Sequence, residues 1–320
     1  MRRRARNIVI GIAAFLVVAY LAIGLAGYLV IGNVRGSCGE HAVNRPDKIV
    51  YVDHWPPIDL SRYAISPYEA VRFPSRQPGI NIAGYWAEAK PGAPAVILAH
   101  GLGGCKNAID VLVPAGMLWR NGFNALLIDV RDVGESDSED GWSSVGNDES
   151  LDVLGAWDWL VTTKGYAPER IGLFGVSMGG ATSLFAFQDE PRIAALFVEG
   201  TFASLLAVVA DQMTGYGLPG FMAQPAAAIF RLVSKENIMA HTPIAAIRSA
   251  GSRPVYIVHS HGDRRISVSQ SQELAAAALD AGVNVKAWFP ERSEHLQTPA
   301  LYPEEFERRL VGFFREALGN

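Results

Sequence analysis

Residues 175–179 read Gly-Val-Ser-Met-Gly and place Ser177 between two glycines in the pattern Gly-X-Ser-X-Gly. The apolar run 170–174 predicts a strand before this motif, and the alanine-rich run after it predicts a helix. The two glycines let neighbouring backbones crowd the turn, which would hold Ser177 in a strained conformation with its hydroxyl exposed. A serine presented in this way is a candidate nucleophile, although a plain glycine-serine helix start would have the same letters.

A serine hydroxyl is a weak nucleophile at neutral pH and needs a base that a carboxylate orients. His295 lies in a short polar loop between the last expected strand and the last expected helix, so we expect it to be the base. Asp263 follows the apolar run 255–258 and is the expected acid. The alternatives left open are Glu199 and Asp129 for the acid and, less well placed for the base, His41, His54, His100 and His241.

Attack by a serine puts negative charge on the substrate oxygen, and backbone N–H groups aimed at that oxygen lower the barrier. Met178 begins the helix after the motif, so its N–H and the helix dipole can serve this purpose. The second donor should come from the loop 100–104, which reads His-Gly-Leu-Gly-Gly, and Leu102 is our candidate. A tight turn alone would also explain these glycines.

Residues 259–263 read His-Ser-His-Gly-Asp, a spacing that binds zinc in some hydrolases and would activate water in place of a serine. Arg264 and Arg265 follow directly and would repel a metal ion. A small-molecule receptor without turnover is a third alternative, because one fold serves many functions. We expect a serine hydrolase that needs no cofactor and no metal.

These side chains must be positioned by the elements between them. From residue 68 onward, short apolar runs alternate with longer amphipathic ones, which predicts a mostly parallel, doubly wound α/β sheet. The expected strands are 68–73 and 80–87, paired as an antiparallel hairpin, then 95–99, 125–129, 170–174, 194–198, 255–258 and 283–289. The expected helices are 108–120, 148–163, 178–188, 269–281 and 303–318.

One segment interrupts this alternation. Between Glu199 and Arg253 the chain is rich in alanine, methionine and phenylalanine. We expect a small helical cap there, at about 202–250, over the carboxyl ends of the strands, where such sheets bind ligands. The catalytic domain would then comprise residues 68–320, preceded by a polar linker and lead-in at 33–67.

The amino-terminal segment 1–32 has a different character. Arginines at positions 2, 3, 4 and 6 precede an uncharged run from Ile8 to Ile31. A helix of that length reaches about 36 Å and can cross a hydrocarbon core of about 30 Å. We expect a retained anchor, with a cleaved signal peptide as the alternative. The arginines would keep the amino terminus in the cytoplasm and place the catalytic domain outside.

Composition and charge set further limits. A hydrophobic share of 49% against 19% charged residues excludes disorder as the main state. The net charge of −4 gives no basic surface for nucleic acid, so we expect no such partner. Cys38 and Cys105 are the only cysteines, and a bridge between them is an alternative that we do not expect. No feature of the sequence sets an oligomeric state.

From about Tyr68 to Leu318 the chain resembles the α/β-hydrolase superfamily of serine hydrolases, most of all its single-pass membrane-anchored esterases and lipases, which also resemble serine aminopeptidases. The similarity rests on HGLGG at 100–104, LLIDVRDVGES at 126–136, GVSMGG at 175–180, the loop of Asp263 and SEHLQ at 293–297. The resemblance implies a small-molecule ester or acyl substrate, a lipid among the candidates, or else a peptide or amide. The site residues that it implies are the triad Ser177, Asp263 and His295, with Leu102 and Met178 as oxyanion donors.

Two positions depart from the family pattern. Asp132 stands where many relatives have glycine, and we expect it to change a surface loop only. Ser260 replaces the glycine that usually follows the histidine at the strand end, which bears on the turn that places Asp263. Because base catalysis needs a neutral His295, the implied activity should fall below about pH 6 to 7.

Overall fold

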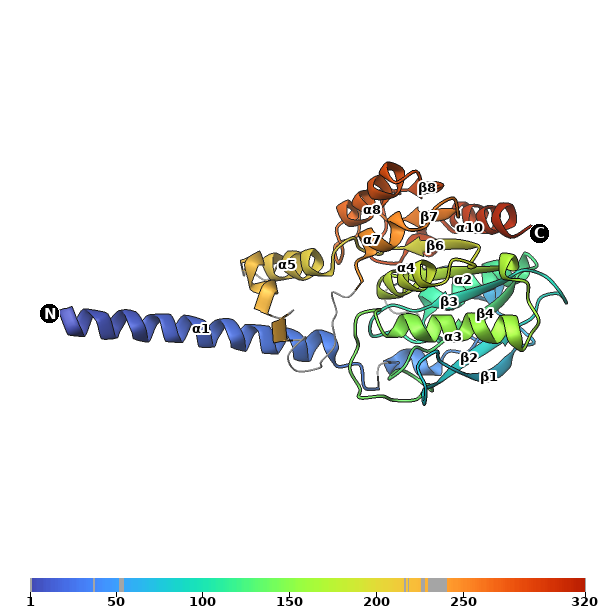
Figure 1. The fold of residues 1–320 in the computed structure, drawn as a ribbon. Coiled ribbons are helices and arrows are strands. Elements are labelled where there is room, and N and C mark those ends of the chain that lie inside the picture. Colours follow the sequence, from blue (N-terminus) through green and yellow to red (C-terminus); the bar gives the residue numbers. More distant parts are fainter. Residues whose placement is uncertain are drawn as a thin grey trace.

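Eight strands in the described part of the chain form one sheet in the order β1-β2-β4-β3-β5-β6-β7-β8 (Figure 1). The computed structural model describes residues 2–36, 38–51, 55–215, 217, 219–225, 228–229 and 241–319. β1 pairs antiparallel with β2, and β2 antiparallel with β4. All the other neighbouring pairs are parallel. The predicted mostly parallel α/β sheet with an opening hairpin is therefore confirmed.

The strands are β1 Glu69–Pro74, β2 Asn81–Ala87, β3 Ala95–Ala99, β4 Asn124–Ile128, β5 Ile171–Val176, β6 Ala195–Glu199, β7 Val255–Val258 and β8 Val285–Trp288. The helices are α1 Arg2–Gly32, α2 Ile109–Arg120, α3 Glu149–Thr162, α4 Met178–Asp189, α5 Leu205–Gly215, α7 Pro243–Arg248, α8 Val268–Asp280, α9 Thr298–Leu301 and α10 Pro303–Leu318. Short 3-10 turns are η1 Gly39–Val43, η2 Leu60–Tyr63, η3 Pro168–Arg170 and η4 Gly220–Met222. The predicted strands and the predicted helices of the catalytic domain are all present, α5 and α7 lie within the expected helical cap, and the short α9 is additional.

Helices cover both faces of the sheet (Figure 1). α3, α4, α7 and α8 contribute to the core on one face, and α2 and α10 to the core on the other. The alternation along β3 shows the division, because Ile97 belongs to the first core while Val96 and Leu98 belong to the second. A strand buried on both faces has no polar side, which is why these strands are continuous apolar runs in the sequence.

The second core contains a close approach between η2 and α2. A Cβ on Gly116 would lie 2.2 Å from the backbone oxygen of Tyr63, so no larger residue fits at this point of α2. Glycine within a helix costs about 1 kcal/mol relative to alanine. This glycine offsets that cost by letting the buried Tyr63 and the lead-in segment pack onto α2.

Helix α1 projects away from the domain (Figure 1). Residues 3–26 of this helix form a segment apolar and long enough overall to cross a membrane, although it begins with arginines, and only 6% of its apolar 18-residue window is buried. Its length and composition therefore make α1 a candidate membrane span.

The segment after α1 packs against the domain. The N–H of Ser143 donates to the backbone oxygen of Gly32 at 2.8 Å, and that of Val34 to the backbone oxygen of Gly141 at 3.2 Å. Cys38 and Cys105 form a disulfide, so our expectation of unpaired cysteines is wrong. Val34 packs in one small apolar cluster with both cysteines. This tertiary contact brings the two thiols together, and no spacing of two cysteines predicts it.

The segment between β6 and β7 begins with α5, which lies beside the domain on the side from which α1 projects (Figure 1). η4 contacts α1. Residues 230–240, the middle of the expected cap, lie outside the described residues. The short helix α7 packs against α4 and α8.

Candidate active site

Ser177 lies between β5 and α4, at the carboxyl edge of the sheet. Its φ of 53° and ψ of −120° give the strained turn that the motif predicts. A Cβ on Gly175 would lie 2.3 Å from the backbone oxygen of Gly179, and a Cβ on Gly179 would lie 2.3 Å from that of His100. Both glycines are therefore required by close packing. The N–H of Ser177 donates to the backbone oxygen of Glu199 at 2.9 Å, which fixes the turn to β6.

His295 joins the three predicted residues. Its Nε2 lies 3.0 Å from Oγ of Ser177, and its Nδ1 lies 2.7 Å from Oδ2 of Asp263. They come together because β5, β7 and β8 are parallel, so the loops that follow them leave the same edge of the sheet. An ionised carboxylate only accepts, so Nδ1 carries the proton and Nε2 of the neutral ring accepts from Ser177.

Asp263 is held by its own loop and by a second histidine. Its Oδ1 accepts the N–H groups of Arg265 at 2.8 Å and Ile266 at 2.9 Å. Nε2 of the buried His259 lies 3.0 Å from Oδ2 of Asp263 and 2.9 Å from the backbone oxygen of Ile266. Both partners are acceptors, so this nitrogen donates and orients the carboxylate. The sequence pattern suggests a zinc ligand at His259 and gives no sign of this contact.

Ser260 does not disturb the placement of the acid. Its Oγ accepts the N–H of Gly262 at 3.0 Å and the N–H of Ser293 at 2.8 Å. Ser293 stands two residues before His295. The departure from glycine at position 260 therefore connects the loop of the acid to the loop of the base.

The electrostatics of the pair suit proton transfer. Burial raises the pKa of Asp263, but the hydrogen bonds from His259 and His295 outweigh burial and hold this pKa below its ordinary value. Burial lowers the pKa of His295, and the hydrogen bond and charge of Asp263 oppose this only in part. At pH 7 the site therefore holds an ionised acid and a neutral base.

Met178 and Leu102 supply backbone near the serine from two sides. Met178 is the first residue of α4. The loop of Leu102 reaches the serine, because a Cβ on Gly101 would lie 3.2 Å from Cβ of Ser177. Within the described part of the chain, neither the N–H of Met178 nor that of Leu102 donates a hydrogen bond. Both are thus available to a substrate oxygen.

A buried ion pair holds the loop of Leu102. Nζ of Lys106 lies 2.5 Å from Oδ2 of Asp129, and the N–H of Lys106 donates to Oδ1 at 2.7 Å. Asp129, an alternative acid in the sequence analysis, is engaged here and makes no contact with His295 among the interactions of the described residues. No sequence pattern distinguishes this lysine, so its role was missed.

Glu199, the other alternative acid, ends β6 and is buried. Burial raises its pKa to about 8, and the neighbouring Thr298 opposes this only in part. At pH 7 the carboxyl group is therefore neutral and cannot stabilise an imidazolium ion as an anion would.

Asp132 organises the loop that follows it. Its φ is 62°, which explains why glycine suits this position in relatives, and its side chain is buried. Its Oδ1 accepts from the hydroxyl of Ser138 at 2.6 Å and from the N–H groups of Glu139 at 2.8 Å and Gly141 at 2.7 Å. The loop that this aspartate organises, residues 134–140, is largely exposed, which agrees with an effect on a surface loop, and the adjoining Gly141 accepts the N–H of Val34 after α1.

The remaining histidines do not reach the serine in the described structure. His100 is buried, with Nδ1 2.8 Å from the backbone oxygen of Gly101. His241 contacts Asn147, and His41 packs edge-on against Tyr51. His54 lies outside the described residues.

The zinc alternative finds no ligand set in the described part of the chain. Both ring nitrogens of His259 are engaged within the protein, Nδ1 with Ser271 at 2.7 Å. The ring of His261 packs against Phe289 instead of facing His259. No group of three or more histidine, cysteine, aspartate or glutamate side chains is arranged there to hold a metal ion.

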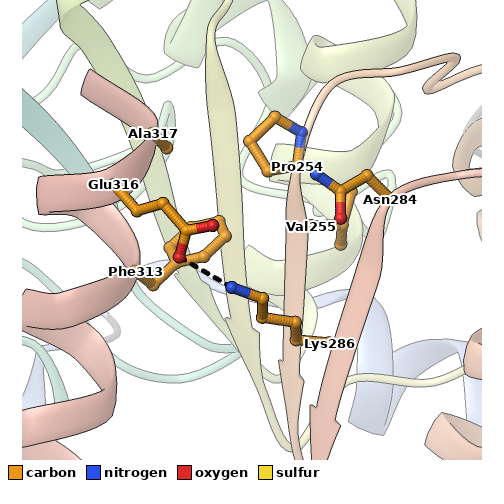
Figure 2. A pocket seen from close by; sticks show the side chains of 7 residues that line it. All are labelled: Pro254, Val255, Asn284, Lys286, Phe313, Glu316 and Ala317. Atoms are coloured by element: carbon orange, nitrogen blue, oxygen red, sulfur yellow. Dashed lines mark hydrogen bonds and ion pairs between the residues drawn. The ribbon is translucent and has the colours of Figure 1, made fainter. Parts of the chain in front are cut away.

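Two cavities of about 230 Å³ lie at opposite edges of the sheet. The first is at the carboxyl edge, and its apolar lining includes Val145, Phe185, Phe202, Ala203, Leu205 and Ile244. The second lies beside the ion pair of Lys286 with Glu316, whose atoms are 2.7 Å apart (Figure 2). Its residues Pro254 and Asn284 stand just before β7 and β8, so it lies at the amino edge, away from Ser177.

A strained serine, a histidine and a buried aspartate, at the carboxyl edge of a mostly parallel sheet, define a serine hydrolase of the α/β-hydrolase fold. The model of the prolyl oligopeptidase family matches residues 115–320, which is more than half of the chain. The protein belongs to this family, and the predicted superfamily is confirmed.

Two curated proteins are similar over part of their length. A thiohydrolase, aneE, of Aspergillus aculeatus is 30% identical over 131 residues, covering 39% of this chain and 40% of that protein. An uncharacterized 31.7 kDa protein in the traX-finO intergenic region of Escherichia coli is 31% identical over 122 residues, covering 38% of this chain and 41% of that protein. The matches thus span about 40% of the length of these relatives.

Solved structures share the fold. An esterase of Pyrococcus furiosus has a TM-score of 0.65 at 21% identity, covering 85% of this chain and 98% of that chain. The acylaminoacyl peptidase of Pyrococcus horikoshii has a TM-score of 0.60 at 19% identity, covering 79% of this chain and 42% of that chain.

Proposed function

We propose that this hydrolase cleaves carboxylic esters or thioesters through an acyl-enzyme intermediate on Ser177. The observation that carries the proposal is the hydrogen-bond relay, 3.0 Å from Ser177 to His295 and 2.7 Å from His295 to Asp263. Such a relay activates a hydroxyl group that is otherwise a weak nucleophile.

In the first step, Oγ of Ser177 attacks the carbonyl carbon of the substrate while Nε2 of His295 takes its proton. Asp263 stabilises the imidazolium ion that forms. The N–H groups of Leu102 and Met178 bind the oxyanion, which contributes several kcal/mol to lowering the barrier. His295 then protonates the leaving alcohol or thiol, and the acyl group remains on Ser177.

In the second step, a water molecule attacks the acyl carbon, and His295 again acts as the base. The carboxylic acid leaves and Ser177 regains its proton. Both steps need the neutral imidazole, which the lowered pKa of His295 supplies at pH 7.

The cavity at the carboxyl edge supports an acyl substrate. Its walls come from the segment after β6, from the loop before α3 and from α4, whose first residue follows Ser177. Phe202 of its lining belongs to the same core cluster as Met178. Its volume of about 230 Å³ lies below the range of about 300–1,000 Å³ of drug-sized sites, which suits a single acyl chain. A thiohydrolase among the relatives agrees with acyl thioesters as one substrate class.

The nucleophile is tested by labelling the full chain with a fluorophosphonate probe. We expect labelling that Ser177→Ala abolishes and that a chelator does not change. The matched control is Ser183→Ala, which alters another buried serine on α4 and should label like the wild type. Labelling that survives Ser177→Ala would refute the proposed nucleophile, and measurable ester turnover separates an enzyme from a receptor.

The substrate class is tested with p-nitrophenyl esters of increasing chain length. We expect kcat/KM to rise beyond the acetate and then to fall once the chain exceeds the cavity. Ala203 is buried in the cavity wall, so Ala203→Leu should shift the optimum to shorter chains. A sharp preference for acetate in the wild type would contradict acyl-chain recognition.

Hydrolysis of peptide amides is a second candidate, favoured by the membership of the prolyl oligopeptidase family. We expect an amide to be cleaved more slowly than an ester of the same acyl group, because its leaving group is poorer. A larger kcat/KM for the amide would reverse the order of the two candidates.

We also propose that α1 is a retained anchor with its amino terminus in the cytoplasm. The arginine-rich tip supports this orientation. The disulfide between Cys38 and Cys105 supports an extracytoplasmic domain, because disulfides persist in oxidising compartments. The intact mass of the protein extracted from membranes should include residues 1–32, and protease added to intact cells should cleave the domain. A mass that lacks the apolar run would show a cleaved signal peptide instead.

A further inference from the structure

Helix α5 is apolar yet contains no buried residue. Its sequence is LLAVVADQMTG, and each of its residues is at least partly exposed. Its one charged residue, Asp211, faces the catalytic domain, where it lines a cavity with Arg265 and Asp263. Leu206, Val209 and Met213 have the spacing of a single helix face and are all partly exposed. A short helix that is apolar on nearly every side normally requires an apolar environment.

The apolar character continues beyond α5. No Asp, Glu, Lys or Arg occurs from 212 to 230 in the sequence. Phe221, in η4, exposes 62% of its surface. α5 and η4, which we call the cap arm, thus present apolar side chains without the charges that normally keep such a surface in water.

η4 and the chain just after it pack on α1. A Cβ on Gly24 would lie 2.8 Å from the backbone carbon of Pro225 and 2.9 Å from the side chain of Ile229. Gly24 is buried, whereas the described side chains of α1 from Arg3 to Val18 are all exposed. This glycine therefore allows the backbone segment after η4 to pack directly on α1.

The depth of that contact follows from helix geometry. Sixteen residues separate Ile8, the start of the uncharged run, from Gly24. They rise about 24 Å, whereas the hydrocarbon core of a bilayer is about 30 Å thick. With Ile8 at the inner boundary, Gly24 lies about 6 Å below the outer boundary, and a tilted helix would lie deeper. Interfacial helices bury their apolar faces to a depth of about 5–10 Å.

The domain is also attached at the carboxyl end of α1. The backbone of Gly32 and Val34 is bonded to Ser143 and Gly141, and the disulfide ties Cys38 to the residue that follows the loop of Leu102. Because the domain is attached to α1 both at Gly24 and at the carboxyl end of the helix, its height along α1 and its rotation about α1 are both set. The cap arm consequently lies on the side of the domain from which α1 projects (Figure 1).

We propose that the cap arm inserts into the outer leaflet of the phospholipid bilayer beside α1, held at that depth by the contact at Gly24. The proposal rests on the proposed retention of α1 as an anchor. The base of α5 lines the apolar cavity at the carboxyl edge of the sheet, through Leu205. An acyl ester in the outer leaflet therefore reaches the cavity along the cap arm without crossing water.

The test places the photo-crosslinker p-benzoylphenylalanine at one position at a time in the full chain, reconstituted into phosphatidylcholine vesicles. Phe15 of α1 reports the anchor, Phe221 reports the cap arm, and Leu279 of α8 is the matched control. Phe221 and Leu279 are equally exposed, at 62% and 65%. We expect mass spectrometry to detect phospholipid adducts at positions 15 and 221 and no adduct at position 279.

Each outcome has a distinct meaning. An adduct at 15 without one at 221, or equal adducts at 221 and 279, would overturn the insertion while leaving the anchor in place. No adduct at 15 would show that the anchor itself fails, and the inference with it. Fluorophosphonate labelling of Ser177 in the same samples reports the proposed catalytic function separately.

A pair of glycine variants tests the contact that holds the cap arm. Gly24→Val keeps α1 apolar but introduces the clash with Pro225, whereas Gly11→Val meets nothing within 4 Å. We expect Gly24→Val to reduce the adduct at 221 severalfold and to leave the adduct at 15, and Gly11→Val to leave both. An unchanged adduct at 221 in Gly24→Val would overturn the role of this contact.

Discussion

Replacing Glu199 with glutamine should stabilise the protein at neutral pH and have little effect at pH 5. The pKa of Glu199 is about 8 in the folded protein against an ordinary value of 4.5, chiefly because burial disfavours its charged form. Between these values the folded state keeps a proton that the unfolded chain releases. The free energy of unfolding therefore falls as pH rises, by up to about 1.4 kcal/mol per pH unit, and levels off above about pH 8.

From pH 5 to pH 7.5 the loss amounts to about 3 kcal/mol. Glutamine cannot ionise and resembles the neutral carboxyl, so Glu199→Gln should gain about this much over the wild type between the two pH values. The assay is urea denaturation of the full chain in mild detergent, followed by tryptophan fluorescence. A difference between variant and wild type that is equal at pH 5 and pH 7.5 would refute the reasoning.

Glu190 provides a matched control, because its pKa is shifted downward whereas that of Glu199 is shifted upward. The hydrogen bond from Arg192 lowers its pKa, and although burial opposes this, a further bond from Arg76 helps to bring the pKa to about 2. Because the pKa of Glu190 is lowered on folding, its ionised form stabilises the folded protein at any pH above the ordinary pKa of 4.5. This stabilisation is lost only as the pH falls toward 2. Glu190→Gln should therefore destabilise the protein equally at pH 5 and pH 7.5.

Three further outcomes are expected. kcat/KM for a short ester should fall at acid pH as His295 becomes protonated, at a pH below the ordinary pKa of histidine because burial lowers the pKa of this ring, and a profile without an acidic limb would contradict its role as base. His259→Ala should lower kcat about 10- to 100-fold, because Asp263 loses a hydrogen bond worth about 1.5–3 kcal/mol. It should also move the acidic limb to higher pH, because burial is the main cause that lowers the pKa of His295 and His259 adds to it, and an unmoved limb would leave His259 only a packing role. Gly116→Ala should destabilise by about 1–3 kcal/mol, and Gly312→Ala, with open space around it, should not; equal shifts in Tm would contradict the packing.

The strands, and the meeting of the three candidate site residues at one edge of the sheet, could be predicted because their signals are local. Most of the parallel strands are short apolar runs, β8 with its Lys286 being the exception, and the parallel order brings the loops after β5, β7 and β8 to one edge whatever lies between them. A polar residue in such a loop, as at Ser177, Asp263 and His295, is therefore a site candidate from the sequence alone.

The orienting residues behind the site have no such signal. His259 ends the strand that precedes Asp263 and matches a zinc spacing as well as it matches an orienting role. Only the direction of its ring, with Nε2 3.0 Å from Asp263, distinguishes the two. Lys106 is one charged residue in a loop, and its partner Asp129 follows a different strand.

Two of the glycines of α1, Gly11 and Gly24, show most clearly what a sequence omits. Gly11 and Gly24 stand in the same uncharged run, and a hydropathy pattern treats them alike. One faces open space, and the other has no room for a Cβ because a segment some two hundred residues later packs onto it. The hydropathy pattern indicates whether α1 prefers an apolar environment. The contact at Gly24 depends instead on which later segment of the chain packs onto α1. Substitution of each glycine by the same residue therefore separates the apolar character of the run, which both positions share, from the tertiary contact, which Gly24 makes and Gly11 does not.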